Sequence, residues 1–291
     1  MEIHDLHDDD MPVGRILTRR EVLALLGSAG TAMVAGTAFT KLGLSRIVSA
    51  SAPLQTPTGT VVPACVVRPA LTEGPYFVDE MLNRSDIRIE PSDGSIKEGT
   101  VLRLMFQVSD ISADACMPLE GAQVDIWHCD ALGVYSGVTD PGFDTSEQYW
   151  LRGYQVTDKD GVAEFITIYP GWYSGRAVHI HFKIRTDPAA EAGYEFTSQL
   201  FFPEETNDLI HVQQPYASKG YRNVLNKNDG IYRQSGDMLL LNVVEDEEAE
   251  EGEEGYVAIF DIALDTSDMS SSTQSNGAPG GGGRPSGEGR P

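Results

Sequence analysis

The chain has 291 residues and a formal net charge of −23 at pH 7, from 44 acidic and 21 basic side chains. This excess of negative charge argues against nucleic acid or an anionic lipid surface as a partner, because both carry the same sign. Part of the charge lies in the acidic run 245–254, which we interpret as a solvated loop.

Residues 1–50 have the pattern of an export signal. Arg19-Arg20 precedes an apolar run at 25–35, and Val48-Ser49-Ala50 follows as a small-residue cleavage site. Adjacent arginines before such a run are typical of the twin-arginine route, which predicts a periplasmic or extracellular protein. An uncleaved membrane anchor is the alternative. We rank it second because the run is shorter than the ~20 residues that a span needs. No membrane contact is expected after the signal is removed.

The rest of the chain suits one domain. Residues 51–98 are interpreted as an extended lead-in, and residues 99–265 as a folded core. Short β-rich runs separated by turn signals predict strands, at 101–108, 122–128, 150–157, 162–168, 177–184, 197–202, 238–244 and 256–264. We expect the last two to form a hairpin around the acidic run. No long amphipathic helix interrupts the series, so the pattern predicts an all-β fold, an antiparallel sandwich of about eight strands with long loops. The Ser/Gly/Pro-rich residues 266–291 are predicted to be disordered.

The predicted strand 177–184 carries two histidines. His179 and His181 alternate with apolar residues, so they lie on one face, roughly 6.5 Å apart at ~3.3 Å per residue. Two imidazoles at this separation can bind one metal ion, but the pair fits zinc, copper, nickel or iron. A surface strand with two solvated histidines is the alternative interpretation.

Two tyrosines are expected near the histidine pair. Tyr173 ends the turn Pro170-Gly171-Trp172-Tyr173, where Pro and Gly let the chain reverse toward the end of the histidine strand. Tyr135 follows the strand 122–128 and would reach the same place if the two strands are neighbours. A phenol binds a metal as an anion only when a strongly acidic cation displaces its proton. Two phenolates with two imidazoles therefore favour Fe(III) over Fe(II) and zinc.

The chain resembles the intradiol ring-cleavage dioxygenases over roughly residues 65–264. The resemblance rests on motifs in the family's order: Trp127 with Gly133-Val134-Tyr135, Pro170-Gly171-Trp172-Tyr173, Arg176-Ala177-Val178-His179-Ile180-His181, and Ser198-Gln199-Leu200-Phe201-Phe202-Pro203. It implies a β-sandwich in which a non-haem Fe(3+) ion is bound by Tyr135, Tyr173, His179 and His181. Trp127-His128-Cys129-Asp130-Ala131 and Asp229-Gly230-Ile231-Tyr232 look like an exported branch of the family.

The resemblance also implies the reaction and further site residues. A small aromatic diol of the catechol type and O2 would be the substrates, and a cis,cis-muconate the product. Tyr173 would accept a substrate proton, Arg176 would stabilise negative charge on the ring, and Gln199 would orient the arginine or the substrate. Tyr76 and Trp172 are candidate substrate contacts, although Trp172 also suits a packing role. The preferred catechol and the oligomeric state stay open.

Three further residue types have predicted roles. An exported protein with Cys65, Cys116 and Cys129 is expected to contain one disulfide. Cys116 and Cys129 bracket a strand and would lie too far apart to bond, so we favour a bond from Cys65 to one of them. His128 could support a metal ligand, but a hydrogen-bonded structural histidine is favoured. His211 is expected at the surface.

Two other functions compete with the dioxygenase interpretation. One is a non-catalytic exported β-sandwich binding module, which has no need for two tyrosines and Arg176 to converge with the histidines. The other is a zinc or copper hydrolase or oxidase built on the histidine pair, but no carboxylate or third histidine lies in an obvious ligand position.

Overall fold

The computed structural model describes residues 65–113, 115–188, 193–247 and 255–267, which belong to one compact unit. The predicted signal at 1–50, most of the acidic run and nearly all of the predicted disordered tail lie outside these residues. In the part of the chain that is described, no helix has the length and apolar character needed to cross a membrane.

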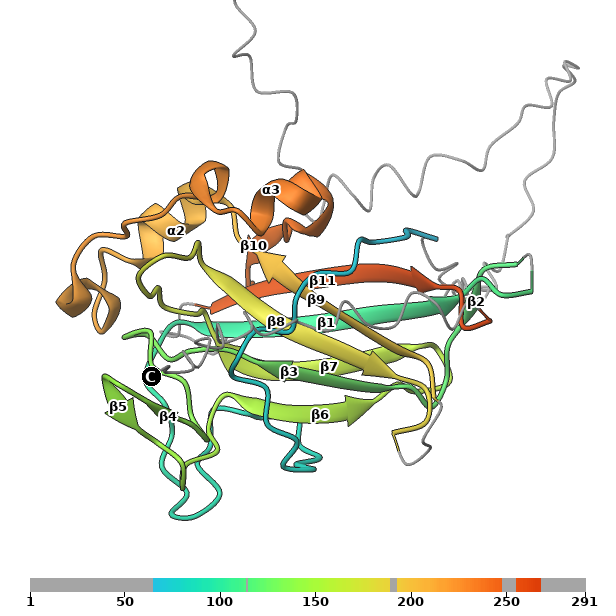
Figure 1. The fold of residues 1–291 in the computed structure, drawn as a ribbon, viewed down its shortest axis with the longest axis horizontal. Helices are drawn as coiled ribbons and strands as arrows, with labels where there is room; N and C mark the ends of the chain where they lie inside the picture. The colour runs from blue at the N-terminus through green and yellow to red at the C-terminus, as the bar shows by residue number, and fades with distance from the viewer. Residues whose placement is uncertain (1–64, 114, 189–192, 248–254, 268–291) are drawn as a thin grey trace, which may run out of the picture. The chain divides into compact units, whose positions relative to one another are not determined.

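Two β-sheets form the body of this unit (Figure 1). In the five-stranded sheet, β10 (Val243–Glu245), β11 (Gly255–Leu264), β1 (Val101–Asp110) and β2 (Met117–Pro118) follow in order, and β7 (Val162–Ile168) also pairs with β1. The four-stranded sheet has the order β6 (Arg152–Val156), β3 (Gln123–Trp127), β8 (His179–Arg185) and β9 (Glu195–Phe201). The prediction of an all-β fold is confirmed. A separate two-stranded ribbon joins β4 (Thr139–Asp140) to β5 (Phe143–Asp144).

The main core lies between the two sheets. Alternate residues of β1 are fully buried, as are Ile180, Phe182 and Ile184 of β8. The Phe182 ring centroid lies 5.3 Å from that of Phe106 on β1 and 5.5 Å from that of Phe260 on β11, so side chains of the two sheets interdigitate. Burying a side chain of this size stabilises the fold by roughly 1.5–3 kcal/mol.

The second face of β8 is also buried, which differs from the half-buried strand that the alternation predicts. The reason is the segment 71–80, which we call the covering segment and which runs over this face. Glu73 pairs with Lys183, and Asp79 pairs with Arg185 at 2.7 Å. The long-range ion pairs that hold this segment are not visible in a local pattern.

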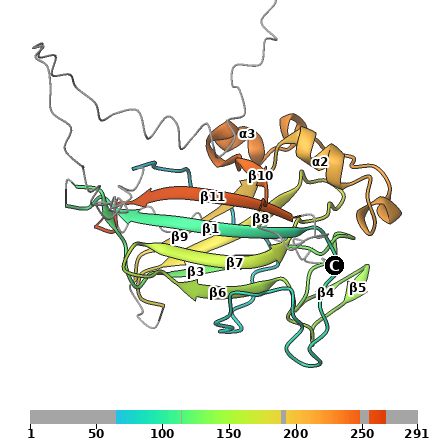
Figure 2. The same cartoon turned by 180° about the vertical axis from the view of Figure 1, so that it is seen from behind.

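Other expectations need correction. Of the predicted strand 238–244, only the end belongs to β10, and Gly236–Leu239 forms a 3-10 helix, η3. β10 and β11 do pair antiparallel, but β1 and β11 run parallel, so the sandwich is not purely antiparallel. Four further helical segments, α2 (Glu204–Ile210), η1 (Tyr216–Lys219), η2 (Asn226–Asn228) and α3 (Tyr232–Ser235), follow β9. Figure 2 shows α2 and α3 at one edge of the sheets, near β10.

Two side-chain expectations have clear outcomes. Cys65 is bonded to Cys116, while Cys129 is a buried free thiol. His211 is buried, not at the surface: its Nε2 donates to the carbonyl of Pro170 at 3.1 Å, and its ring packs against Tyr216. The helices after β9 form the surroundings that enclose it.

Candidate metal centre

The histidine pair lies at the start of β8, beside the end of β3. His181 is the register partner of Trp127 on β3, and the two rings stack with centroids 5.1 Å apart and planes 10° apart. Both histidines are buried. The neighbouring-strand relation on which the placement of Tyr135 depends is therefore present.

Two glycines bring the tyrosine loops together. At Gly133, with φ +77°, an added Cβ would lie 2.1 Å from the Trp172 carbonyl oxygen, so a side chain cannot be accommodated. At Gly171 a Cβ would lie 2.4 Å from the carbonyl oxygen of Ala131. The loop that carries Tyr135 and the turn that carries Tyr173 thus pack backbone against backbone, which explains why both motifs contain glycine.

Three polar atoms lie close together at the N-terminal end of β8. Nε2 of His179 lies 3.0 Å from Nε2 of His181 and 3.2 Å from Oη of Tyr173. Tyr135 is fully buried, and its ring centroid lies 5.7 Å from that of Tyr173 and 6.3 Å from that of His181. Its hydroxyl makes no hydrogen bond to a described residue, which is costly for a buried polar group.

The surroundings keep the four groups uncharged in the absence of a cation. Burial lowers the pKa values of His179 and His181 well below the ordinary range, and Arg176 adds to this effect. Burial raises the pKa of Tyr135 well above its usual value and that of Tyr173 to about 12, although Arg176 acts in the opposite direction on Tyr173. Neutral imidazoles are the form that binds metals, whereas the phenols need a strong Lewis acid to ionise.

This donor set fits a ferric ion. Nδ1 of His179 donates to the carbonyl of Ala177 at 2.7 Å, which leaves the Nε2 lone pair facing the other donors, an arrangement usual for metal-binding histidines. Among the described residues, no group of three or more His, Cys, Asp and Glu side chains is placed to hold a metal. Among the described side chains, the two phenols are thus the donors beside the histidine pair, in place of the carboxylate or third histidine of a common zinc site.

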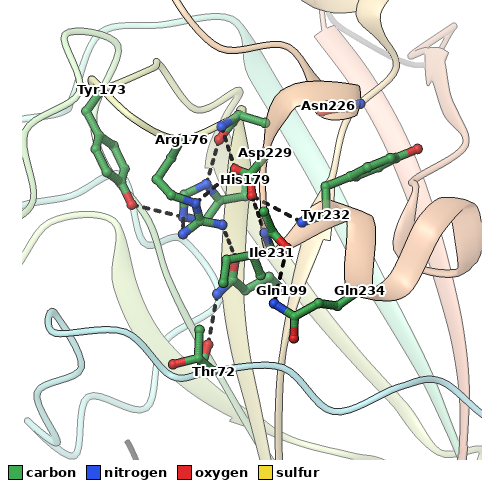
Figure 3. A network of polar contacts seen from close by, with 12 residues as sticks. Thr72, Tyr173, Arg176, His179, Gln199, Asn226, Asp229, Ile231, Tyr232 and Gln234 are labelled. Atoms are coloured by element: carbon green, nitrogen blue, oxygen red, sulfur yellow. Dashed lines mark hydrogen bonds and ion pairs between the residues drawn. The ribbon is translucent and has the colours of Figure 1, made fainter. Parts of the chain in front are cut away.

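Arg176 is held at the edge of this site by two side chains (Figure 3). Its Nε donates to Oδ2 of Asp229 at 2.9 Å, and its Nη2 donates to Oε1 of Gln199 at 2.6 Å. Nη1 remains 3.5 Å from Nε2 of His179. The guanidinium therefore presents Nη1 toward the donor atoms while Nε and Nη2 are held by hydrogen bonds.

Asp229 and Gln199 are in turn fixed by the backbone. Asp229 is buried; its Oδ2 also accepts from the Ala177 amide at 2.8 Å, and its Oδ1 accepts from the amide of Ile231 at 2.6 Å. Gln199, likewise buried, donates from Nε2 to the carbonyl of Thr72 at 2.8 Å. The network joins the arginine to the covering segment and to the loop before α3.

Tyr76 of the covering segment completes an aromatic cluster around Tyr135. The Tyr76 and Tyr135 rings stack with centroids 4.5 Å apart, and the Tyr76 hydroxyl donates to Oδ2 of Asp140 at 2.8 Å. Burial and this hydrogen bond raise the pKa of Tyr76 to about 12. Gly74 allows the close approach, because a Cβ there would lie 3.1 Å from Cε1 of His181.

The structure thus brings most of the predicted site residues together, from four parts of the chain. Trp172 is the exception: it packs against the main core, with Nζ of Lys219 5.2 Å from its ring centroid, and its substrate contact stays a prediction. His128 bonds through Nε2 to Thr167 at 2.7 Å and through Nδ1 to the Cys129 carbonyl at 2.9 Å, as the structural interpretation expects.

Sequence reasoning missed three polar residues near the site: Asp229, Asp140 and Arg152. Asp229 begins the motif Asp229-Gly230-Ile231-Tyr232, in which nothing indicates a contact with Arg176. Arg152 is buried, and it donates to the hydroxyl and carbonyl of Ser136 and to the carbonyl of Tyr76. No local pattern distinguishes these three from ordinary surface charges.

The chain is similar in sequence to known dioxygenases. A family model described as "Dioxygenase" matches residues 72–266. Chlorocatechol 1,2-dioxygenase of Pseudomonas putida is 28% identical over 149 residues, covering 45% of this chain and 52% of that enzyme. Catechol 1,2-dioxygenase of Candida albicans is 24% identical over 182 residues, covering 54% of this chain and 55% of that enzyme. The chain spans about half the length of these curated relatives.

A solved structure covers more of the chain. The intradiol ring-cleavage dioxygenase from Tetranychus urticae is 31% identical and superposes with a TM-score of 0.57, covering 69% of this chain and 96% of that one. Together with the family model, this similarity shows that the chain belongs to the intradiol ring-cleavage dioxygenase family.

Proposed function

We propose that this chain is an Fe(III)-dependent intradiol dioxygenase that cleaves a catechol-type ring with O2 to a cis,cis-muconate-type product. One observation supports the proposal most directly. Nε2 of His179 lies 3.2 Å from the Tyr173 hydroxyl and 3.0 Å from Nε2 of His181, and the nearby Tyr135 has a buried hydroxyl without a hydrogen-bond partner among the described residues. Relatives named as catechol and chlorocatechol 1,2-dioxygenases support the reaction class.

Tyr135, Tyr173, His179 and His181 would hold the iron. The chemistry that a ferric ion supplies when bound is Lewis acidity toward the two phenols and the catechol oxygens, together with withdrawal of electrons from the ring. Burial raises the pKa values of both phenols, so only a strong Lewis acid such as a ferric ion would ionise them.

Tyr173 is the residue best suited to receive a proton from the diol. It is only partly buried, whereas Tyr135 is 1% exposed, so Tyr173 can meet a substrate and turn away from the histidines. Its Oη would accept the proton as a general base. Tyr135, enclosed by Trp127 and Tyr76, would stay in place.

Arg176 would stabilise negative charge that develops on the substrate ring. Nη1 is the guanidinium nitrogen nearest to the donor atoms, and Asp229 and Gln199 hold the other side of the group. A donor fixed before the reaction needs no reorganisation when charge develops, which is the basis of such electrostatic stabilisation. A non-catalytic binding module would not need this pre-positioned arginine.

We also propose that the protein acts after export by the twin-arginine route. The disulfide between Cys65 and Cys116 supports this proposal, because disulfides persist mainly in oxidising compartments. Fractionation of cells that produce the full chain tests it. Replacing Arg19 and Arg20 by lysine should retain the protein in the cytoplasm, and unchanged export would contradict the route.

The test of the proposed function is a visible spectrum of the purified, iron-loaded protein, before and after anaerobic addition of catechol. We expect a broad charge-transfer band from iron-bound tyrosinate that moves to longer wavelength when catechol is added. Admitting O2 should then yield the muconate. A folded protein that stays colourless after iron loading would overturn the metal assignment.

A further inference from the structure

The Tyr76–Asp140 pair lies at the exposed side of the aromatic cluster. Tyr135 is buried, whereas Tyr76 and Tyr173 are only partly so, and the Tyr76 ring stands edge-on to the Tyr173 ring at 6.5 Å. A substrate ring bound beside Tyr135 and Tyr173 therefore has Tyr76 as a neighbour. Asp140, the last residue of β4, lies beside the Tyr76 hydroxyl.

The pair is held in a fixed position. The backbone of Tyr76 is anchored where its carbonyl accepts from Nη1 of buried Arg152 at 3.3 Å. Asp140 is held on both oxygens: Oδ2 accepts from the Tyr76 hydroxyl at 2.8 Å, and Oδ1 accepts from the Gly142 amide at 3.1 Å. Both partners are neutral, so the hydrogen bonds orient the carboxylate without cancelling its charge.

Arg176 and Lys183, two basic side chains around the site, are each paired with carboxylates of this chain. Arg176 is paired with Asp229, and Lys183 with Glu73 and Glu195. Within the described parts of the chain, no basic side chain pairs with Asp140. Arg152 is 3% exposed and donates all its bonds to Ser136 and the Tyr76 carbonyl, so it offers nothing to a ligand.

We propose that Asp140, oriented by Tyr76, makes the site select catechols with uncharged ring substituents and reject those that carry a carboxylate. A substituent that extends from the substrate ring toward Tyr76 would approach the negative charge of Asp140, next to the aromatic rings of Tyr76 and Tyr135. Like charges placed against a competing ligand are an established means of specificity. The proposal rests on the proposed function, and it assigns the substrate class of that same site.

Coulomb's law gives the scale of the effect for an assumed separation of the two charges. Two unit charges about 7 Å apart at an effective dielectric constant of about 40, between the values for a protein surface and for water, change a binding constant by roughly tenfold. We therefore expect wild-type protein to cleave catechol with a kcat/KM that exceeds that for 3,4-dihydroxybenzoate by at least that factor.

The experiment compares kcat/KM for catechol and for 3,4-dihydroxybenzoate in three iron-loaded full-length proteins: wild type, Asp140→Asn and Asp144→Asn. Asp144 lies on β5 of the same ribbon, is exposed and bonds to Thr139 and Ser146, so its replacement makes the same change in net charge without touching Tyr76. Asp140→Asn should raise the ratio of kcat/KM for 3,4-dihydroxybenzoate to kcat/KM for catechol about tenfold. Asp144→Asn should leave the ratio as in wild type.

A salt titration of wild type gives a second measurement that needs no folded variant. Raising the ionic strength screens the partly exposed charge of Asp140, so the ratio of kcat/KM for catechol to that for 3,4-dihydroxybenzoate should fall. Equal ratios in all three proteins, or a wild type that cleaves both substrates equally well, would overturn the inference while leaving ring cleavage intact. Absence of cleavage of either compound would instead overturn the proposed function, and this inference with it.

Discussion

Arg176 donates from Nε to Oδ2 of Asp229 at 2.9 Å, across 53 positions of sequence. The carboxylate is completely buried and also accepts three backbone amides, from Ala177, Ile231 and Tyr232. Asp229 therefore connects the turn before β8 to the loop before α3, and it sets the direction in which the guanidinium points.

Asp229→Asn should lower kcat/KM about 10- to 100-fold without loss of iron. The asparagine keeps the shape of the side chain but removes the charge, and a hydrogen bond to a charged group contributes about 1.5–3 kcal/mol. Steady-state kinetics together with iron analysis measure this. Asp237→Asn is the control, because Asp237 is exposed and bonds to Tyr232. Equal losses in both variants would show that Asp229 has no special relation to the site.

Arg176→Ala should retain the iron and reduce kcat about 100- to 1,000-fold, the usual cost of removing one fixed donor. Arg176→Lys should not restore the rate, because the single nitrogen of an ammonium group cannot take the three separate positions of Nε, Nη1 and Nη2. Arg233→Ala, at an exposed position, is the control. If Arg176→Ala loses its iron, the arginine has a structural role instead.

Tyr173→Phe should lose part of the visible absorption and at least ~100-fold in turnover, because it removes a proposed metal ligand and the proposed base for the diol proton. Tyr135 remains in this variant, so some colour should persist. Tyr221→Phe, at a residue that is 92% exposed, should match wild type in both respects. Wild-type turnover in Tyr173→Phe is the outcome that would disprove the ligand assignment.

The fold should lose stability in mild acid partly through His211. Burial lowers the pKa of this residue from 6.5 to about 4, so between these values the unfolded state binds a proton that the folded state does not. The free energy of unfolding therefore falls as pH drops from 6.5 to 4, by up to about 3 kcal/mol from this group.

Urea unfolding at pH 7 and pH 4.5 measures this loss. His211→Gln does not titrate and can still donate to the Pro170 carbonyl, so its loss of stability between the two pH values should be smaller than that of wild type. Other buried groups, including His128, titrate alike in both proteins and cancel in the comparison. Identical losses would show that His211 does not contribute.

Short-range patterns in the sequence were sufficient for much of the fold. The alternation around His179 and His181 predicts a strand with both imidazoles on one face, because side chains of a strand alternate strictly. The predicted strand 162–168 has the same bounds as β7. The prediction failed at 238–244, where apolar residues form η3 before a short strand, since a short apolar run suits either element.

The identity of the four candidate ligands could be expected from the motifs, but their surroundings could not. Asp229, the carboxylate partner of Arg176, lies 53 positions away from it, and Asp140, the partner of Tyr76, lies 64 positions away. The residues next to each carboxylate in the sequence do not indicate which distant side chain it contacts. The covering segment likewise buries the second face of β8 through the pairs of Glu73 with Lys183 and Asp79 with Arg185.

The β-rich class, the histidine strand and the types of donor atoms can be predicted from the sequence, because they depend on periodicity and on side-chain chemistry. The parallel pairing of β1 with β11, the burial of His211, and the positions of Asp229 and Asp140 are visible only in the folded chain. Those features depend on which distant segments pack together, and that is set by the free energy of the whole core.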